Sequence, residues 1–544
     1  MTMTTYDYII IGAGSAGCAL AGRLADAQPG SIALLEAGGH DQKRVITLPI
    51  GFAATVPKAG PFNYGYQTEP QPGLNGRQIF QPRGRGLGGS SSINAMVYIR
   101  GVPSDYDHWA ELGCAGWSWQ DVLPYFKRSE ANIRLAGHAE TQLHGGVGPL
   151  KVADTRSTNP FDRRFIEATL AAGYPYNDDF NGSTQEGVGF YQRTQLNGER
   201  WNAARAYLHG GAMPLNGGRS NLQVLTDSQV LRILFEGKRA VGVEHMHNGQ
   251  RQVLRARREV ILSAGSYGSP QLLMVSGVGP AEHLAEHGIE LVQDLPEVGQ
   301  NLQEHPDARL HMRLFSTDLY AASVPGGLRM LGEWQRYRRD RYGMFASNIV
   351  ETGAFLKSRA ELPDPDLQLH FGTSFGDLQK LGTHGYNGHV CVLRPHSRGE
   401  LRLASADARE APLINPNLLG DPRDLEAMLT GVHLVKRILD QPQLASLGGK
   451  AHFHAHLKFD GSDDEAVKQM IRERTETAFH PVGTCRMGAD RESVVDPQLR
   501  VRGIDGLRVV DVSIMPKLIG GNTNAPAMMI GEKACDLLLQ EQQQ

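Results

Sequence analysis

The sequence has little cysteine, little net charge and no long hydrophobic segment. Its five cysteines are scattered and form no Cys-x-x-Cys pair, which argues against a disulfide scaffold and against a zinc site. A formal net charge of -3 gives no electrostatic reason to expect nucleic acid as a partner. No apolar run reaches the roughly 18 residues that a bilayer requires, and no signal peptide is recognisable. We therefore expect a cytoplasmic protein, or one that lies on the inner surface of a membrane.

Length and apolar patterning indicate more than one folding unit. The 544 residues exceed what one hydrophobic core usually serves, and the 64 glycines indicate many tight turns. Short apolar runs that end near a glycine or an acid are typical of buried parallel strands, and they occur at 8–11, 32–35, 258–262 and 507–511. Alternating segments at 366–370 and 390–393 instead suit an antiparallel sheet.

A glycine motif near the N-terminus indicates a nucleotide site. The residues Gly12-Ala13-Gly14-Ser15-Ala16-Gly17 match G-x-G-x-x-G between a predicted strand and a helix predicted from about Gly14 to Asp26. Backbone N–H groups at such a helix N-terminus hold a pyrophosphate, and Glu36 after the next strand is placed to bind ribose hydroxyls. An ordinary tight turn is the alternative, which the strand, helix and acid together disfavour. The motif alone does not separate FAD from NAD.

These patterns predict an α/β fold with two interleaved domains. A Rossmann-like nucleotide domain is expected from three stretches, residues 1–155, 215–305 and 465–544. A second α+β domain, built on an antiparallel sheet, is expected from residues 156–214 and 306–464. The substrate is expected to bind between the two.

Longer motifs resemble the glucose-methanol-choline (GMC) oxidoreductases, flavoproteins that oxidise alcohols. The glycine-rich and serine-rich run from Gly84 through Asn94 to Asp107 is similar to the first family signature, and the run from Gly265 to Gly279 is similar to the second. Residues 298–305 resemble a further segment, except that Glu304 stands where Asp is commoner. The resemblance extends from residue 7 to about residue 538. Bacterial FAD-dependent aliphatic alcohol dehydrogenases and choline dehydrogenases are the branch that the sequence resembles most.

The resemblance implies FAD as the cofactor. The residues that it places around FAD are Gly12, Gly14, Ser15, Ala16, Gly17, Glu36, Arg85, Gly88, Gly89, Asn94, Ala95, Met96, Val97, Val230 at the adenine, Asp511 towards the isoalloxazine, and Asn522. Some relatives attach flavin to a histidine directly before the signature asparagine. This chain has Ile93 there, so we expect non-covalent FAD.

His480 is the candidate base. It opens the run 480–488, which resembles the active-site motif of the family, and a neutral imidazole accepts a hydroxyl proton at pH 7. The family partner of this histidine is a His or Asn upstream of the final helix. Asn522 is favoured for that role and Asn524 is the alternative. His305 is expected to pack beneath the flavin domain, and Cys485 to be a buried structural residue.

The function that the resemblance implies is oxidation of an alcohol, primary and aliphatic, to the aldehyde by hydride transfer to flavin. Electrons would then pass to a quinone or another acceptor that is not NAD. The alternatives are an oxygen-using alcohol oxidase, a sugar or choline dehydrogenase, and a hydroxynitrile lyase that binds FAD without using its redox chemistry. A non-catalytic binding module is disfavoured, because it would not need His480 and Asn522 beside a complete cofactor site.

One further segment has the pattern of a basic amphipathic helix. Apolar side chains recur at helical spacing among arginines over residues 328–341, namely Leu328, Leu331, Trp334 and Tyr337 among Arg329, Arg336, Arg338, Arg339 and Arg341. Such a helix can lie on an anionic membrane surface, which would suit a quinone acceptor. A domain helix with a solvated arginine face is the alternative.

Overall fold

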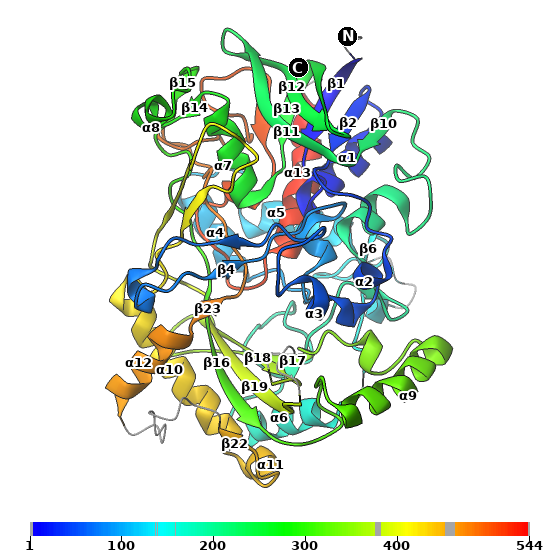
Figure 1. Ribbon diagram of the computed structural model, residues 1–544, viewed down its shortest axis with the longest axis vertical. Coiled ribbons are helices and arrows are strands. Elements are labelled where there is room, and N and C mark those ends of the chain that lie inside the picture. Colours follow the sequence, from blue (N-terminus) through cyan, green and yellow to red (C-terminus); the bar gives the residue numbers. More distant parts are fainter. Residues whose placement is uncertain are drawn as a thin grey trace.

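The computed structural model describes residues 4–135, 138, 140–157, 159–375, 382–451 and 463–541. Two seven-stranded sheets lie one above the other in Figure 1, each with its own hydrophobic core. This arrangement confirms the predicted α/β fold, with a Rossmann-like domain and a second domain built on an antiparallel sheet.

The first sheet has the strand order β10-β2-β1-β13-β12-β11, with β24 paired to β13. The pairs among β10, β2, β1, β13 and β24 are parallel, whereas β11 and β12 form an antiparallel extension. Ile9 and Ile10 are fully buried because helices cover the sheet, as expected for a parallel apolar strand. The elements are β1 (Thr4–Ile11), β2 (Ile32–Leu35), β10 (Leu222–Leu225), β11 (Ser228–Glu236), β12 (Arg239–His247), β13 (Gln250–Leu262), β24 (Leu507–Val509), α1 (Ser15–Ala27) and α13 (Asn524–Glu541).

The second sheet has the order β22-β16-β19-β18-β17-β7, with β23 paired to β16, and its pairs are antiparallel. Helix α10 packs on one face, where Gly431 lets it approach Val390 closely. The elements are β7 (Gly187–Phe190), β16 (Pro306–Arg313), β17 (Thr352–Leu356), β18 (Leu367–Gly372), β19 (Gly385–Val392), β22 (Lys450–Ala451), β23 (Glu476–Thr477), α6 (Pro160–Ala171), α10 (Pro422–Leu439) and α12 (Asp464–Arg474).

Alternation along these strands gives the sheet two different faces. Leu310, Val390 and Leu369 belong to the core beneath α10. Their sequence neighbours Arg309, His389 and His370 point to the opposite face, because successive side chains of a strand alternate. That polar face meets the cavity described below.

The strands of the first sheet all fall within the stretches that the sequence assigns to the nucleotide domain. Strand β23 and helix α12 depart from the predicted boundary at 465, because β23 pairs with β16 and α12 packs against α10. We therefore propose a boundary after β23. The other predicted domain boundaries, at 155/156, 214/215 and 305/306, are kept as a proposal.

The other elements connect these layers. They are α2 (Arg44–Thr47), α3 (Phe52–Thr55), α4 (Pro103–Glu111), α5 (Trp119–Ser129), α7 (Gly265–Val275), α8 (Ala281–Glu286), α9 (Val324–Asp340) and α11 (Pro442–Ala445), with the short strands β3 (Tyr66–Gln67), β4 (Phe80–Gln81), β5 (Glu130–Asn132), β6 (Leu150–Val152), β8 (Gln195–Leu196), β9 (Glu199–Arg200), β14 (Val278–Gly279), β15 (Gln293–Asp294), β20 (Glu400–Arg402) and β21 (Leu413–Asn415). Within the described ranges, no helix combines the length and the apolar character needed to cross a bilayer.

Candidate active site

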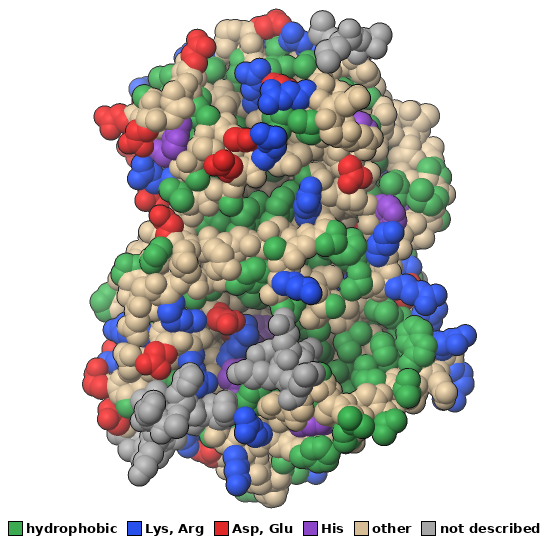
Figure 2. All heavy atoms as spheres, in the orientation of Figure 1, with side chains coloured by type: hydrophobic (Ala, Val, Ile, Leu, Met, Phe, Trp, Pro, Cys, Tyr) green, Lys and Arg blue, Asp and Glu red, His purple; other side chains and the backbone are tan. Residues whose placement is uncertain are grey.

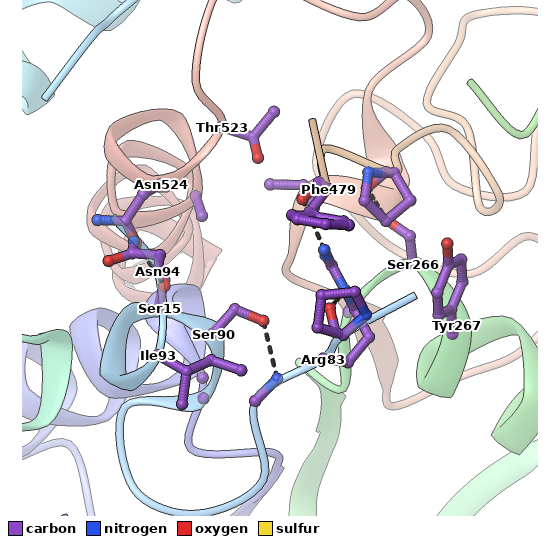
Figure 3. Close-up of a pocket in the computed structure, with 18 of the residues that line it drawn as sticks. Ser15, Arg83, Ser90, Ile93, Asn94, Ser266, Tyr267, Phe479, Thr523 and Asn524 are labelled. Atoms are coloured by element: carbon purple, nitrogen blue, oxygen red, sulfur yellow. Dashed lines mark hydrogen bonds between the residues drawn. The ribbon is translucent and has the colours of Figure 1, made fainter. Parts of the chain in front are cut away.

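A cavity of about 420 Å³ is lined by residues of both domains. Figure 3 shows Ser15, Asn94 and Asn524 on one side of it and Ser266, Tyr267 and Phe479 on the other. A volume of this size lies within the range of small-molecule and cofactor sites. The N-terminal glycine motif, His480 and Asn522 all contribute to its wall, although they are far apart in sequence.

At one end, two glycine loops approach each other too closely for side chains. A Cβ on Gly17 would lie 2.0 Å from the carbonyl oxygen of Gly12, and a Cβ on Gly89 would lie 2.7 Å from Cα of Gly14. Gly12 and Gly89 also have φ values of +99° and +52°, which favour glycine. Glycine is therefore required here, and the result is bare backbone along the cavity wall.

Most of the predicted cofactor residues line this cavity. They are Gly12, Gly14, Ser15, Ala16, Glu36, Gly89, Asn94, Ala95, Met96, Val97, Val230, Asp511 and Asn522. Gly17, Gly88 and Arg85 are not on its wall. Gly17 permits close packing of α1, Gly88 has a φ of +86°, and Arg85 lies over the ring of Tyr64. These three residues support the loops, and direct cofactor contact by them stays a prediction.

Glu36 is arranged as an acceptor for a ribose. Its Oε1 accepts from the backbone N–H groups of Gly38 at 2.9 Å and Gly86 at 2.8 Å, and its Oε2 accepts from Ala13 at 3.0 Å. Burial raises the pKa of this carboxyl, and the three N–H donors oppose the rise. A carboxylate oxygen can accept two hydrogen bonds, so Oε2 retains capacity for a hydroxyl. The residues at this end therefore fit the ribose and pyrophosphate of FAD.

Asp511 instead braces the cavity wall. Its carboxylate accepts from the backbone N–H of Gly265 at 2.9 Å, from the Ser269 hydroxyl at 2.6 Å and from the backbone N–H of Ser513 at 2.8 Å. These bonds join the start of α7 to the segment after β24. Asp511 thus holds together two chain segments that line the cavity.

At the other end, His480 lies between two side chains. Its Nδ1 is 3.0 Å from Nδ1 of His305, and its Nε2 is 3.2 Å from Nδ2 of Asn522. Asn524 lies elsewhere, since its Oδ1 accepts from the Ser15 hydroxyl at 2.8 Å. The geometry therefore favours Asn522 over Asn524 as the neighbour of His480. His305, which was expected to pack beneath the flavin domain, is fully buried and also contacts His480 directly.

The hydrogen bonds around His480 have a defined direction. His305 Nε2 is 3.1 Å from the carbonyl oxygen of Leu393, which can only accept, so His305 carries its proton on Nε2 and accepts at Nδ1. His480 must then donate from Nδ1, which leaves a lone pair on its Nε2. From the other side, Gln368 Nε2 donates to Asn522 Oδ1 at 3.1 Å, which turns the amide N–H of Asn522 towards that lone pair. Both ends of the chain of bonds give His480 the same tautomer.

Glu304 holds the backbone of both histidines. Its Oε1 accepts from the N–H of His305 at 2.8 Å and from the N–H of His480 at 2.6 Å. Burial raises the pKa of Glu304 to about 7. Gln368 and Glu304 were not identified as site residues from the sequence. Glu304 stood inside a recognised motif, whereas nothing in the strand pattern marked Gln368.

Burial keeps both histidines neutral. It lowers the pKa of His305 to about 3 and lowers that of His480 well below 6.5, with nearby His305, His370 and Arg83 adding to the second shift. A neutral His480 has a lone pair at Nε2, which faces the Asn522 amide in this structure and can accept a proton. The site can therefore remove a hydroxyl proton without first losing one.

Two other expectations concern residues outside the cavity. All five cysteines are free and buried, including Cys485, in agreement with a structural role. On α9, Tyr337 is buried, whereas Leu328 and Leu331 are 66% and 65% exposed. Several of the arginines are paired, for example Arg329 with Glu333. Figure 2 shows hydrophobic side chains gathered in the region of α9 with basic residues beside them.

The chain belongs to the GMC oxidoreductase family, which matches residues 6–307 and 395–531. It is 45% identical to an alcohol dehydrogenase [acceptor] of Pseudomonas putida over 98% of this chain and 96% of that protein. It is 41% identical to the mitochondrial choline dehydrogenase of Homo sapiens over 98% of this chain and 89% of that one. The predicted family, the enzyme class of FAD-dependent alcohol dehydrogenase and the cofactor FAD are thereby confirmed.

Solved structures agree with this assignment. The chain superposes on pyridoxine 4-oxidase from Mesorbium loti with a TM-score of 0.85 at 29% identity, covering 98% of this chain and 99% of that one. It superposes on formate oxidase from Aspergillus oryzae with a TM-score of 0.90 at 26% identity, covering 99% of each chain. Ile93 before Asn94 offers no nucleophile to a flavin, which is consistent with non-covalent FAD.

Proposed function

We propose that the protein oxidises a primary alcohol to the aldehyde, with His480 as the base and Asn522 as the donor to the substrate oxygen. The observation that carries this proposal is the directed chain of hydrogen bonds that leaves a lone pair on Nε2 of His480. The high identity to an alcohol dehydrogenase and to choline dehydrogenases supports an alcohol as the substrate.

The proposed reaction places the substrate hydroxyl between the two side chains. The hydroxyl donates to His480 Nε2 and accepts from Asn522 Nδ2, which are 3.2 Å apart when they contact each other directly. His480 takes the proton, and the Asn522 amide stabilises the negative charge that develops on oxygen. FAD supplies the hydride acceptor when bound. The neutral Gln368 and His305 hold these two groups in orientation throughout.

For the electron acceptor, we propose a quinone or another acceptor that is not NAD. The P. putida relative is named for transfer to an acceptor, which supports this choice. An oxidase remains the second candidate, because the structural neighbours include pyridoxine 4-oxidase and formate oxidase.

The test is to mix the holoenzyme anaerobically with a panel of primary alcohols and to record bleaching of the flavin absorbance. Reoxidation is then timed with oxygen, with a quinone and with a dye. Bleaching followed by faster reoxidation with quinone than with oxygen supports the proposal. Flavin that stays oxidised with every alcohol contradicts it and favours non-redox chemistry such as hydroxynitrile cleavage.

We also propose that α9 contacts an anionic membrane surface. Its exposed Val324, Leu328 and Leu331 lie in the same helix as Arg338 and Arg339, an arrangement that suits the headgroup boundary of a bilayer. Partition to vesicles containing anionic lipid should fall with salt and in the variant Arg338→Glu/Arg339→Glu. The control Arg251→Glu, on the first sheet, should bind as the wild type does. Equal partition of all three proteins would contradict membrane contact by α9.

A further inference from the structure

The second sheet presents a row of charged and polar side chains to the same cavity. Arg309 of β16 lies opposite His389 of β19, which in turn lies opposite His370 of β18. Asp307 precedes Arg309 by two residues and therefore shares its face. All four line the cavity that contains His480. A substrate bound at His480 shares this cavity with the row.

The charges in this row are largely paired with one another. Oδ2 of Asp307 accepts from His389 Nδ1 at 2.9 Å and from Arg309 Nε at 3.3 Å. Burial raises the pKa of Asp307, but His389 and Arg309 outweigh it and hold the pKa below its ordinary value, so Asp307 is ionised. Arg309 also forms an ion pair with Glu476, with 2.9 Å between its Nη2 and Oε2 of Glu476. Burial lowers the pKa of His370 to about 4, so this histidine is neutral.

One buried carboxylate oxygen of the row is left without a donor. Asp307 is only 3% exposed, and within the described part of the chain its Oδ1 has no hydrogen-bond donor. Both oxygens of an ionised carboxylate accept hydrogen bonds, and a buried acceptor without a donor is unfavourable. Asp366, which directly precedes β18, has a donor for each oxygen, since the backbone N–H and the hydroxyl of Ser358 donate to them.

We propose that this row is a subsite for a second hydroxyl group of the substrate, which donates to Oδ1 of Asp307. The inference rests on the proposed alcohol oxidation and narrows its substrates from simple alkanols to diols and polyols. A hydroxyl at the far end of the substrate supplies the missing donor. An alkyl group there leaves Oδ1 without a donor and excludes water from the Asp307–Arg309 pair, which is unfavourable. A quaternary ammonium has no proton to donate, and Arg309 and His389 already oppose the charge of Asp307.

The experiment measures anaerobic flavin reduction of the holoenzyme with sets of primary alcohols matched in chain length. Each set contains an α,ω-diol, the ω-methoxy alcohol, the alkanol, the ω-amino alcohol and the ω-trimethylammonium alcohol. The concentration dependence of the bleaching rate gives a binding constant and a limiting rate for each. We expect the ratio of limiting rate to dissociation constant to be roughly ten- to a hundredfold higher for the diol than for the methoxy alcohol or the alkanol. This is the range for a hydrogen bond to a charged group.

The variant Asp307→Asn changes the preference in a defined way. Its amide oxygen can keep the bonds to Arg309 and His389, which places the NH₂ group at the free position. A donor there binds a hydroxyl or an ether oxygen, so the diol and the methoxy alcohol should become similar and both should exceed the alkanol. The matched control Asp366→Asn removes a carboxylate outside the cavity and should keep the wild-type order.

The outcomes separate this inference from the proposed function. If no alcohol bleaches the flavin, the proposed function fails. If the alkanol matches the diol while bleaching is normal, only the subsite is wrong. A preference for the amino or trimethylammonium alcohol over the diol would overturn the hydroxyl assignment, as would an unchanged order in Asp307→Asn.

Discussion

The two ends of the cavity are built in different ways. The nucleotide end is a backbone surface that comes mainly from loops near the N-terminus, where glycines at 12, 14 and 89 leave the cavity wall without side chains. The chemical end is made of side chains from four distant segments, with His480 and Asn522 on the wall and His305 and Gln368 behind them. At the nucleotide end, cofactor binding depends on the absence of side chains at these glycines. At the chemical end, activity depends on the direction of each hydrogen bond.

The largest expected effect is at the nucleotide end. Gly17→Ala places a Cβ 2.0 Å from the carbonyl oxygen of Gly12, so α1 must move away from the loop. We expect purified protein that is strongly depleted of FAD, measured as the ratio of flavin to protein absorbance. The control Gly332→Ala, also within a helix but with open space around its Cβ, should keep its FAD and gain up to about 1 kcal/mol in unfolding free energy. Full flavin content in Gly17→Ala would show that this loop tolerates side chains.

A large effect of another kind is expected at the chemical end. His480→Ala should stay yellow, because the contacts expected for pyrophosphate and ribose lie in other segments. Its anaerobic flavin reduction by alcohol should slow by roughly 10²- to 10⁴-fold, the usual contribution of a general base. Stopped-flow absorbance measures both properties in one sample. Reduction at nearly the wild-type rate would assign the base to another residue.

Asn522→Asp tests the direction of the hydrogen bonds with almost no change in shape. The new carboxylate can only accept, so it removes the donor to the substrate oxygen and raises the pKa of His480. We expect reduction to slow by roughly five- to tenfold even above the acidic limb of the pH profile, and that limb to move to higher pH. Asn522→Ala should slow the same step without moving the limb, because an amide does not titrate. Coincident profiles for the two variants would argue against direct contact with the base.

The smallest expected effect is the response of the wild type to mild acid. Because burial lowers the pKa of His480 well below 6.5, the imidazole stays neutral and able to accept a proton as pH falls through that value. The rate of flavin reduction should therefore lose its histidine-dependent part only well below pH 6.5. Glu304, whose pKa is raised to about 7, can add a separate change near neutrality. A limb near pH 6.5 that persists in Glu304→Gln would mean that His480 titrates as an exposed histidine.

The same difference explains which residues the sequence revealed. Ser15 and Asn94 were predicted because continuous motifs carry them, and Glu36 because it ends the strand that follows the glycine motif. The contact of His305 with His480 was missed because the two residues are 175 positions apart. Gln368 was missed because a buried glutamine in a strand has no distinctive pattern. The row of Asp307, Arg309, His389 and His370 depends on the register of three strands, which the sequence does not state.

The sequence by itself determined the family, the cofactor and the α/β class, and it singled out His480 as the candidate base, because glycine spacing and strand–turn–helix order are local properties that continuous motifs record. Tertiary structure alone decided which tautomer His480 adopts, because that depends on Leu393 and Gln368 at the two ends of a hydrogen-bond chain. It also decided that Oδ1 of Asp307 lacks a donor, because the groups that surround this atom come from other strands. Hydrogen bonds between distant segments are set when the chain packs, and the pairing of β16, β18 and β19 brings these groups together.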